Sequence, residues 1–470
     1  METPKKFNAE TDPFRPGYHI APLQGWINDP NGLVFFKGQY HVFFQYYPDK
    51  PTWGPCHWGH VVSDDMIHWR YLPNAISPDQ EYDSHETEGG CYSGSAIEHE
   101  GRLYLLYTGC CKDRAVFQSQ CLAVSEDGIN FTKYEGNPVI PCPPEDGSRD
   151  FRDPKVWWAN GAFHVVIGSE KNGIGQVLMY SSPDLKSWEY RGVMAKSDGT
   201  EGAMWECPDL AVLPDGDLLV YSPCNAQDGS TRYLFGRLDY TNGVFDRRST
   251  GIIDRGTDFY APQTMQVPDG RRVLIGWLSS WTGMHPTRAH GWAGQLSVPR
   301  ELTVSPEGKL RQTPVKELDA LRTEETKMDL SGTEGTRFLD IEAGVMFELL
   351  LTVNGQIPSV FGFLLRCSQD HSAYTTVTVR TKEGRVEINR EHSGPGDQFG
   401  CDAPIQAEED GGYQLRIFSD RSSLELFTSR YETTMSCNIY PSPENGGIAY
   451  FAEEAAGSEV KLTLWKQAEM

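Results

Sequence analysis

Three acidic residues of the chain, Asp29, Asp153 and Glu206, each stand one or two residues before a proline. A pair of carboxyl groups held in different protonation states is what cleavage of a glycosidic bond requires. The first question is therefore whether the fold brings these three side chains together. The answer depends on the repeats that surround them.

The pattern Ser-x-Asp-x-x-x-aromatic occurs three times, in Ser63–Trp69, Ser125–Phe131 and Ser182–Trp188. The copies start 62 and 57 residues apart, so one structural unit recurs about every 60 residues. Each copy lies near an alternating apolar run, which predicts a β-strand. These runs are Tyr40–Phe44, Leu103–Tyr107 and Phe163–Ile167.

A series of prolines sets the number of units. Pro30, Pro154, Pro208 and Pro262 are separated by 124, 54 and 54 residues, and Tyr92–Ala96 falls near the middle of the first gap. Short strands at a fixed period are typical of units that stack to bury their apolar faces. Roughly 300 residues at about 60 per unit predict a five-bladed β-propeller.

In a propeller the innermost strand of every blade lines one central channel. We therefore expect one residue from each unit to converge on a single cavity. The alternative is that Asp-Pro and Asn-Gly only mark turns, but five such motifs in register make that interpretation weak. The five residues expected at the cavity are Asp29, Ser93, Asp153, Glu206 and Tyr260.

The sequence changes character after Pro299. Residues 315–336 are charged and poor in strand signals, and we interpret them as a linker. Short apolar runs then follow, several of them alternating, which predict a β-sandwich over residues 337–470. The chain is thus expected to be all-β, with a propeller domain over residues 1–314.

Composition narrows the possible partners. The formal charge of −23 argues against nucleic acid or an anionic membrane, and no apolar run approaches the ~18 residues of a membrane span. Met1–Phe7 lacks the apolar stretch of a secretory signal, which predicts a cytoplasmic protein. A secreted form from which a signal has been removed stays an alternative.

Other chemistries find less support. His57 and His60 have no third ligand at a suitable spacing, so we expect no bound metal. The sequence contains no phosphate-binding or dinucleotide-binding loop, so we also expect no cofactor. Ser93 is not in a Gly-x-Ser-x-Gly elbow. The 11 cysteines are scattered and odd in number, so no disulfide framework is indicated, and Cys207 is expected to be a small buried residue.

Five runs of the chain together resemble the signature runs of glycoside hydrolase family 32. They are Trp26–Gly32, Tyr92–Ala96, Arg152–Pro154, Glu206–Pro208 and Asp258–Gln263. The resemblance extends to Asp420–Phe427, which is similar to part of the C-terminal sandwich of that family. It implies a retaining β-fructofuranosidase, close to the bacterial sucrose and sucrose-6-phosphate hydrolases.

The resemblance also implies roles. Asp29 corresponds to the nucleophile, Glu206 to the general acid and base, and Asp153 to the residue that binds fructose hydroxyls and stabilises the transition state. Further positions match residues that line the sugar pocket of the family. They are Asn28, Gln45, Trp53, Tyr92 (often Phe in the family), Ser93, Arg152, Tyr260 and Trp277.

The residues adjacent to each acid in the sequence predict which acid is protonated. Asp153 follows Arg152, whereas Glu206 has no adjacent cation, so we expect Glu206 to hold a proton near neutral pH. Hydrolysis of a small sugar substrate is the leading hypothesis; fructosyl transfer to a sugar acceptor and sugar binding without catalysis are the alternatives. The preference among sucrose, sucrose 6-phosphate and fructo-oligosaccharides stays open, as does the oligomeric state.

Overall fold

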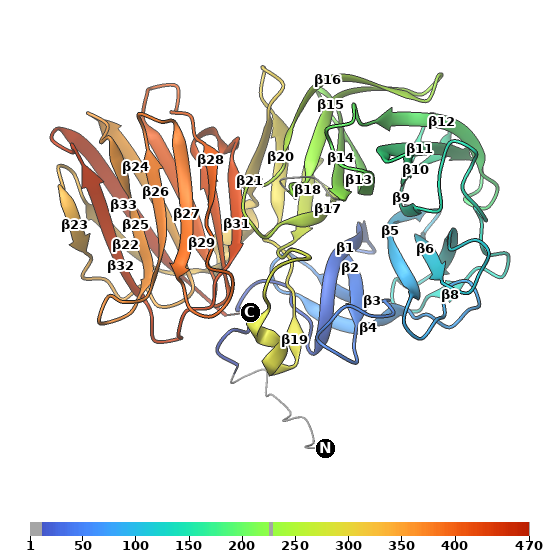
Figure 1. The fold of residues 1–470 in the computed structure, drawn as a ribbon, viewed down its shortest axis with the longest axis horizontal. Helices are drawn as coiled ribbons and strands as arrows, with labels where there is room; N and C mark the ends of the chain where they lie inside the picture. The colour runs from blue at the N-terminus through green and yellow to red at the C-terminus, as the bar shows by residue number, and fades with distance from the viewer. Residues whose placement is uncertain (1–11, 225–228, 470) are drawn as a thin grey trace, which may run out of the picture.

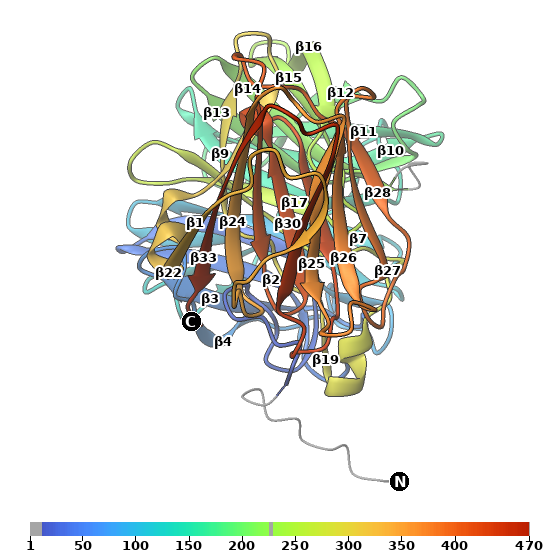
Figure 2. The same ribbon diagram turned by 90° about the vertical axis from the view of Figure 1, so that its left-hand side faces the viewer.

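The computed structural model describes residues 12–224 and 229–469 and contains two β-domains that lie side by side (Figure 1). The predicted fold class is confirmed: a five-bladed β-propeller precedes a β-sandwich. Figure 2 views the molecule from the sandwich side, with the propeller behind it. Met1–Phe7, on which the expected cytoplasmic location rested, lies outside the described residues.

The blades follow one another along the chain. Blade 1 consists of β1 (Gly25–Phe36), β2 (Gln39–Tyr47), β3 (His57–Ser63) and β4 (Arg70–Ile76), with β19 (Trp292–Ala293) parallel to β1. Blade 2 consists of β5 (Gly89–His99), β6 (Arg102–Cys111), β7 (Gln118–Ser125) and β8 (Thr132–Lys133). Blade 3 consists of β9 (Phe151–Ala159), β10 (Ala162–Lys171), β11 (Ile174–Ser182) and β12 (Glu189–Lys196). Blade 4 consists of β13 (Met204–Leu213), β14 (Gly216–Cys224), β15 (Arg232–Asp239) and β16 (Val244–Ile252). Blade 5 consists of β17 (Tyr260–Gln266), β18 (Arg272–Trp277), β20 (Arg300–Val304) and β21 (Leu310–Pro314).

The innermost strands β1, β5, β9, β13 and β17 contact one another in this order, and β17 contacts β1 to close the ring. Apolar side chains fill the space between neighbouring blades. Trp58 of blade 1 packs with Tyr107 of blade 2, for example, and Val166 of blade 3 packs with Trp205 of blade 4. No blade buries its apolar faces alone, which is why the ring must close.

The repeated Ser-x-Asp motif forms the turn between the third and fourth strands of the first three blades. In blade 1, Asp65 Oδ1 accepts hydrogen bonds from the backbone N–H groups of Ile67 (3.0 Å) and His68 (2.9 Å), and from Ser63 Oγ (2.9 Å). Asp127 and Asp184 accept the same backbone bonds in blades 2 and 3. The motif that revealed the period is thus a side-chain-capped turn.

The sandwich packs two six-stranded antiparallel sheets around one core. The first sheet has the order β22 (Arg322–Asp329), β33 (Ser458–Gln467), β24 (Phe347–Gly355), β29 (Tyr413–Ser419), β30 (Ser423–Thr428) and β31 (Thr434–Asn438). The second has the order β23 (Gly335–Phe338), β32 (Gly447–Glu453), β25 (Val360–Cys367), β26 (Tyr374–Arg380), β27 (Arg385–His392) and β28 (Cys401–Pro404). The short 3-10 helices are η2 (Pro286–His290), η3 (Lys316–Leu321) and η4 (Ser429–Tyr431).

The interpretation of residues 315–336 as a linker is wrong. This segment contains η3, and β22 pairs with β33 as an edge strand of the sandwich. The pairing is long-range, from Lys327 to Thr463 for example, and the strand is polar because it is largely exposed. An edge strand with charged residues resists pairing with other chains, and the same residues hide its strand signal.

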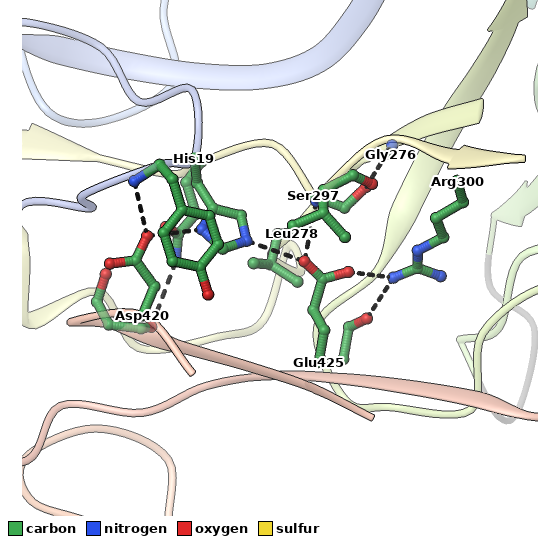
Figure 3. Close-up of polar contacts among 12 residues, drawn as sticks. His19, Gly276, Leu278, Ser297, Arg300, Asp420 and Glu425 are labelled. Carbon is green, nitrogen blue, oxygen red and sulfur yellow. Dashed lines mark hydrogen bonds and ion pairs between the residues drawn. The ribbon is translucent and has the colours of Figure 1, made fainter. Parts of the chain in front are cut away.

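A buried network of charged side chains joins the two domains (Figure 3). His19, which precedes β1, contacts Asp420 through Nδ1 (2.8 Å) and Glu425 through Nε2 (2.9 Å). Glu425 also accepts a hydrogen bond of 2.5 Å from Arg300 of β20, and Arg300 pairs with Asp254 at 2.9 Å. At most 1% of each of these side chains is exposed, so each charge relies on its partners.

Burial by itself would lower the pKa of His19, but the hydrogen bonds to Asp420 and Glu425 outweigh it and raise this pKa to about 9. The pKa values of Asp420 and Glu425 lie below their ordinary range despite burial. His19 is thus a cation held between two carboxylates at neutral pH.

Among the described residues, no helix is long and apolar enough to cross a membrane.

This network predicts a pH-dependent stability. Because the pKa of His19 is raised on folding, its contribution is complete below about pH 6.5 and is lost as the pH rises through about 9. His19→Gln should lower the free energy of unfolding by about 3 kcal/mol at pH 6 and by much less at pH 9.5. Urea denaturation at both pH values measures this. His68→Gln removes an exposed His–Asp pair and should change little. An equal loss for His19→Gln at both pH values would contradict the assignment.

Candidate active site

Each innermost strand carries a β-bulge or irregularity at the position that the sequence predicted to face the channel. The register breaks between Ile27 and Pro30 in β1, between Tyr92 and Gly94 in β5, and between Arg152 and Lys155 in β9. It also breaks after Glu206 in β13 and after Tyr260 in β17. Bulges turn a side chain away from the regular alternation, here into the channel.

The prolines of the motifs have a physical role in these bulges. A proline has no N–H to donate, so it fits where the ladder of hydrogen bonds is already interrupted. Three of the bulges also place a non-glycine residue in the left-handed region just before the proline, at Asp153 (φ 66°), Cys207 (φ 47°) and Ala261 (φ 49°). Such backbone persists only where the surroundings hold it, and it concentrates at functional sites.

Asp29 is buried and is held by a ring of polar side chains. Ser93 Oγ donates a hydrogen bond to Asp29 Oδ2 (2.6 Å), and Asn28 Nδ2 donates to Oδ1 (3.1 Å). Gln45 connects the two donors: its Nε2 donates to Ser93 Oγ (2.5 Å), and its Oε1 accepts from Asn28 (3.2 Å). Blades 1 and 2 together therefore fix the direction of this carboxyl group.

Glu206 is held by a cation and a phenol. Arg152 donates to Glu206 Oε1 from both Nε (3.0 Å) and Nη2 (2.8 Å), and the hydroxyl of Tyr260 donates to Oε2 (2.6 Å). The third guanidinium nitrogen, Nη1, donates to Asp150 Oδ1 (2.6 Å). Residues of blades 3 and 5 thus meet at an acid of blade 4.

Asp153 lies close to both other acids through Cys207. The backbone N–H of Cys207 donates to Asp153 Oδ2 (2.9 Å), and its Sγ lies 3.6 Å from this oxygen and 3.4 Å from Asp29 Oδ2. The sequence predicted that Cys207 is a small buried residue, and it is 2% exposed. The structure brings Asp29, Asp153 and Glu206 together at one cavity.

The three acids differ in their affinity for protons. Burial, with the charge of Glu206, raises the pKa of Asp29; burial, with the charges of Glu206 and Asp29, raises the pKa of Asp153 to about 7 against the effect of Arg152. Burial would also raise the pKa of Glu206, but Arg152, Cys224 and Tyr260 hold it below its ordinary value.

This order is the reverse of the expectation: the pKa of Asp153 is raised to about 7, whereas the pKa of Glu206 is held below its ordinary value. Adjacency in sequence misled the expectation. Arg152 sits next to Asp153 along the chain, yet its guanidinium reaches across to the neighbouring blade and donates to Glu206.

The cavity has a volume of about 300 Å³, enough for a sugar unit. Most of the residues predicted to bind substrate line it, and Ser93 and Tyr260 lie just behind, bonded to the acids. The predicted residues on its wall are Asn28, Asp29, Gln45, Trp53, Tyr92, Arg152, Asp153 and Glu206. Trp53 and Tyr92 pack edge to face there, with ring centroids 6.0 Å apart.

Trp277 does not line the cavity, in contrast to the expectation from the sequence. Its side chain is fully buried in the core, and the ring of Trp281 packs on it with centroids 5.0 Å apart. Trp281, in the loop after β18, is 48% exposed and takes the place at the wall. Sequence reasoning missed it and three other wall residues, Phe117, Gln118 and Asp150. Phe117, Asp150 and Trp281 lie in loops, and Gln118 is the first residue of β7, outside the repeated motifs.

The chain matches the models of the glycosyl hydrolases family 32 N-terminal domain over residues 19–314 and C-terminal domain over residues 309–466. The chain belongs to glycosyl hydrolase family 32. It is similar to the sucrose-6-phosphate hydrolase of Escherichia coli, with 37% identity over 96% of this chain and 95% of that protein. The enzyme is a glycoside hydrolase of the β-fructofuranosidase class.

Solved structures of the family agree with this fold. The sucrose-6-phosphate hydrolase from Lactobacillus gasseri superposes with a TM-score of 0.89 at 29% identity, covering 98% of this chain and 94% of that one. A mutant of a Bombyx mori beta-fructofuranosidase, solved in complex with sucrose, gives a TM-score of 0.83 at 35% identity over 99% and 95% of the two chains. Within residues 12–224 and 229–469, no group of three or more His, Cys, Asp or Glu side chains is arranged to hold a metal ion.

The site geometry predicts a shift of the pH profile in an Arg152 variant. The alkaline limb of kcat/KM should lie near pH 7 in the wild type, where the coupled acids lose their proton. In Arg152→Gln the cation no longer lowers the pKa of Glu206. The alkaline limb should therefore move up by about one pH unit or more, and the maximal kcat/KM should be lower. Arg152→Lys keeps a cation and serves as the control. A limb that does not move in Arg152→Gln would refute the electrostatic role of Arg152.

Proposed function

We propose that the enzyme hydrolyses the terminal β-fructosyl bond of sucrose or a close relative of sucrose, with retention of configuration. The observation that carries this proposal is the convergence of three buried acids with unlike partners on one sugar-sized cavity. The relatives support the substrate class, since one is named for sucrose 6-phosphate and another was solved with sucrose.

Asp29 is the proposed nucleophile. Its carboxylate attacks the anomeric carbon of the fructosyl unit, the bond from this carbon to the leaving-group oxygen breaks, and a fructosyl ester forms on Asp29. Ser93 and Asn28 bond both oxygens of Asp29, which favours the ionised form and fixes its direction. Asp153 is proposed to bind fructose hydroxyls and to stabilise the positive charge that develops at the anomeric carbon.

Glu206 is the proposed general acid and base. It protonates the leaving-group oxygen in the first step and takes a proton from water in the second, when water attacks the anomeric carbon and frees Asp29. The three acids titrate as one unit. We therefore propose that the proton that Glu206 donates is the proton that resides mainly on Asp153 near neutral pH. Arg152 then stabilises the Glu206 carboxylate that remains after donation.

Two variants test this division of labour. Asp29→Asn should abolish turnover of every β-fructoside, because both steps pass through Asp29. Glu206→Gln should lower kcat on sucrose by about 10²–10⁴, but should slow fructosylation less with an activated aryl fructoside, whose leaving group needs little acid assistance. Burst kinetics with both substrates measure this. An Asp29→Asn enzyme that still turns over the aryl fructoside would refute the assignment.

Product analysis tests the reaction itself. On sucrose, hydrolysis releases glucose and fructose in equal amounts, fructosyl transfer releases excess glucose, and sugar binding alone releases neither. Retention requires that the β-anomer of fructose appears first, which NMR of the initial product detects. Release of the α-anomer first would contradict the ester intermediate.

A further inference from the structure

Asp150 occupies an outer position on the cavity wall. It immediately precedes β9, and its side chain is 39% exposed, whereas Asp29 and Asp153 are buried residues. In the proposed reaction the fructosyl unit lies against these buried acids. We infer that the leaving group lies toward the exposed part of the wall, which includes Asp150.

Acidic groups outnumber basic groups on the cavity wall. Four carboxyl groups line it, and Arg152 is the one cation among the described residues on the wall. Each nitrogen of this guanidinium already donates to a carboxylate, Nε and Nη2 to Glu206 and Nη1 to Asp150. Nη1 also donates to Gln118 Oε1 (3.4 Å), and the charge of Arg152 is already shared between two carboxylates, which weakens its attraction for an anionic leaving group.

Asp150 itself has one oxygen committed and one available. Oδ1 accepts the 2.6 Å hydrogen bond from Arg152, and the structure gives no partner for Oδ2. A half-exposed carboxylate oxygen accepts hydrogen bonds from sugar hydroxyls and repels phosphate. Gln118 lies beside it on the wall and offers an amide to the same hydroxyl groups.

Resting on the proposed function, we propose that Asp150 is a specificity residue that selects an uncharged leaving group, so that the enzyme prefers sucrose to sucrose 6-phosphate. The carboxylate accepts a hydrogen bond from a glucosyl hydroxyl and disfavours a phosphate on that glucosyl unit. Specificity of this kind combines an attractive contact with a repulsive one.

A neighbouring cation, Arg149, would attract a phosphate and so oppose the repulsion by Asp150, and the experiment must distinguish the two residues. Arg149 lies over the ring of Phe117, another wall residue, with its guanidinium carbon 4.6 Å from the ring centroid. If Arg149 were to bind a phosphorylated leaving group, the enzyme would prefer sucrose 6-phosphate, and Arg149→Gln would abolish this preference. The two residues therefore predict opposite ratios.

The experiment compares kcat/KM on sucrose and sucrose 6-phosphate, by fructose release, at low and high salt. The wild type should favour sucrose by about tenfold or more in kcat/KM. At 0.5 M NaCl, where salt limits charge repulsion to roughly one contact distance, this preference for sucrose should be smaller. Asp150→Asn should narrow it several-fold at low salt. Glu145→Gln, which removes an exposed carboxylate from the same loop, is the matched control and should leave the ratio unchanged.

The outcomes separate this proposal from the function on which it rests. A wild type that prefers sucrose 6-phosphate, or an Asp150→Asn enzyme that loses activity on both substrates equally, would overturn the role of Asp150. The second result would mean that Asp150 only supports Arg152. Fructose release from neither substrate by the wild type would refute the proposed function, and this inference with it.

Discussion

Three acidic side chains, Asp29, Asp153 and Glu206, share one cavity with a single guanidinium, and much of the structure around the site serves this constraint. Three carboxylates placed this close repel one another, so the site holds a proton and divides its charge unequally. Arg152 decides the division because it donates twice to Glu206 and once to Asp150. Asp29 is instead served by neutral donors, Ser93 and Asn28. A carboxylate held by neutral donors stays available to attack, and a carboxylate paired with a cation is a stable product of proton donation.

The propeller meets this constraint because it is assembled from separate blades. Polar contacts that hold Asp29, Asp153 and Glu206 cross between neighbouring blades, as the bond from Ser93 of β5 to Asp29 of β1 shows, so they depend on how the blades pack together. Bulges at the channel end of each inner strand turn the side chains inward, and proline tolerates the interrupted ladder. Contacts between blades hold the strained backbone at Asp153 and Cys207: the N–H of Cys207 bonds to Asp153, and Cys207 packs in a core cluster with residues of blades 1 and 5.

The sandwich contributes at a distance from the acids. Its buried carboxylates, Asp420 and Glu425, hold His19 just before the first inner strand and Arg300 at the start of β20 (Figure 3). A second buried pair, Arg390 with Asp258, binds the loop that leads into β17 and Tyr260. These contacts fix the chain at the two blades that close the ring, so the C-terminal domain stabilises the site without supplying a residue to its wall.

The sequence by itself determined the number of blades and the residues that converge, because a period of about 60 residues and a proline at a fixed place both follow from local turn and bulge chemistry. The Ser-x-Asp turns and the acids before prolines are local signals of this kind. The tertiary structure alone decided which partner each side chain finds. Arg152 pairs with Glu206 rather than with its neighbour Asp153, Trp281 rather than Trp277 reaches the wall, and the charged segment Arg322–Asp329 becomes an edge strand. Each of these depends on contacts between residues far apart in the chain, and the direction of a side chain across a closed ring is not encoded in its neighbours.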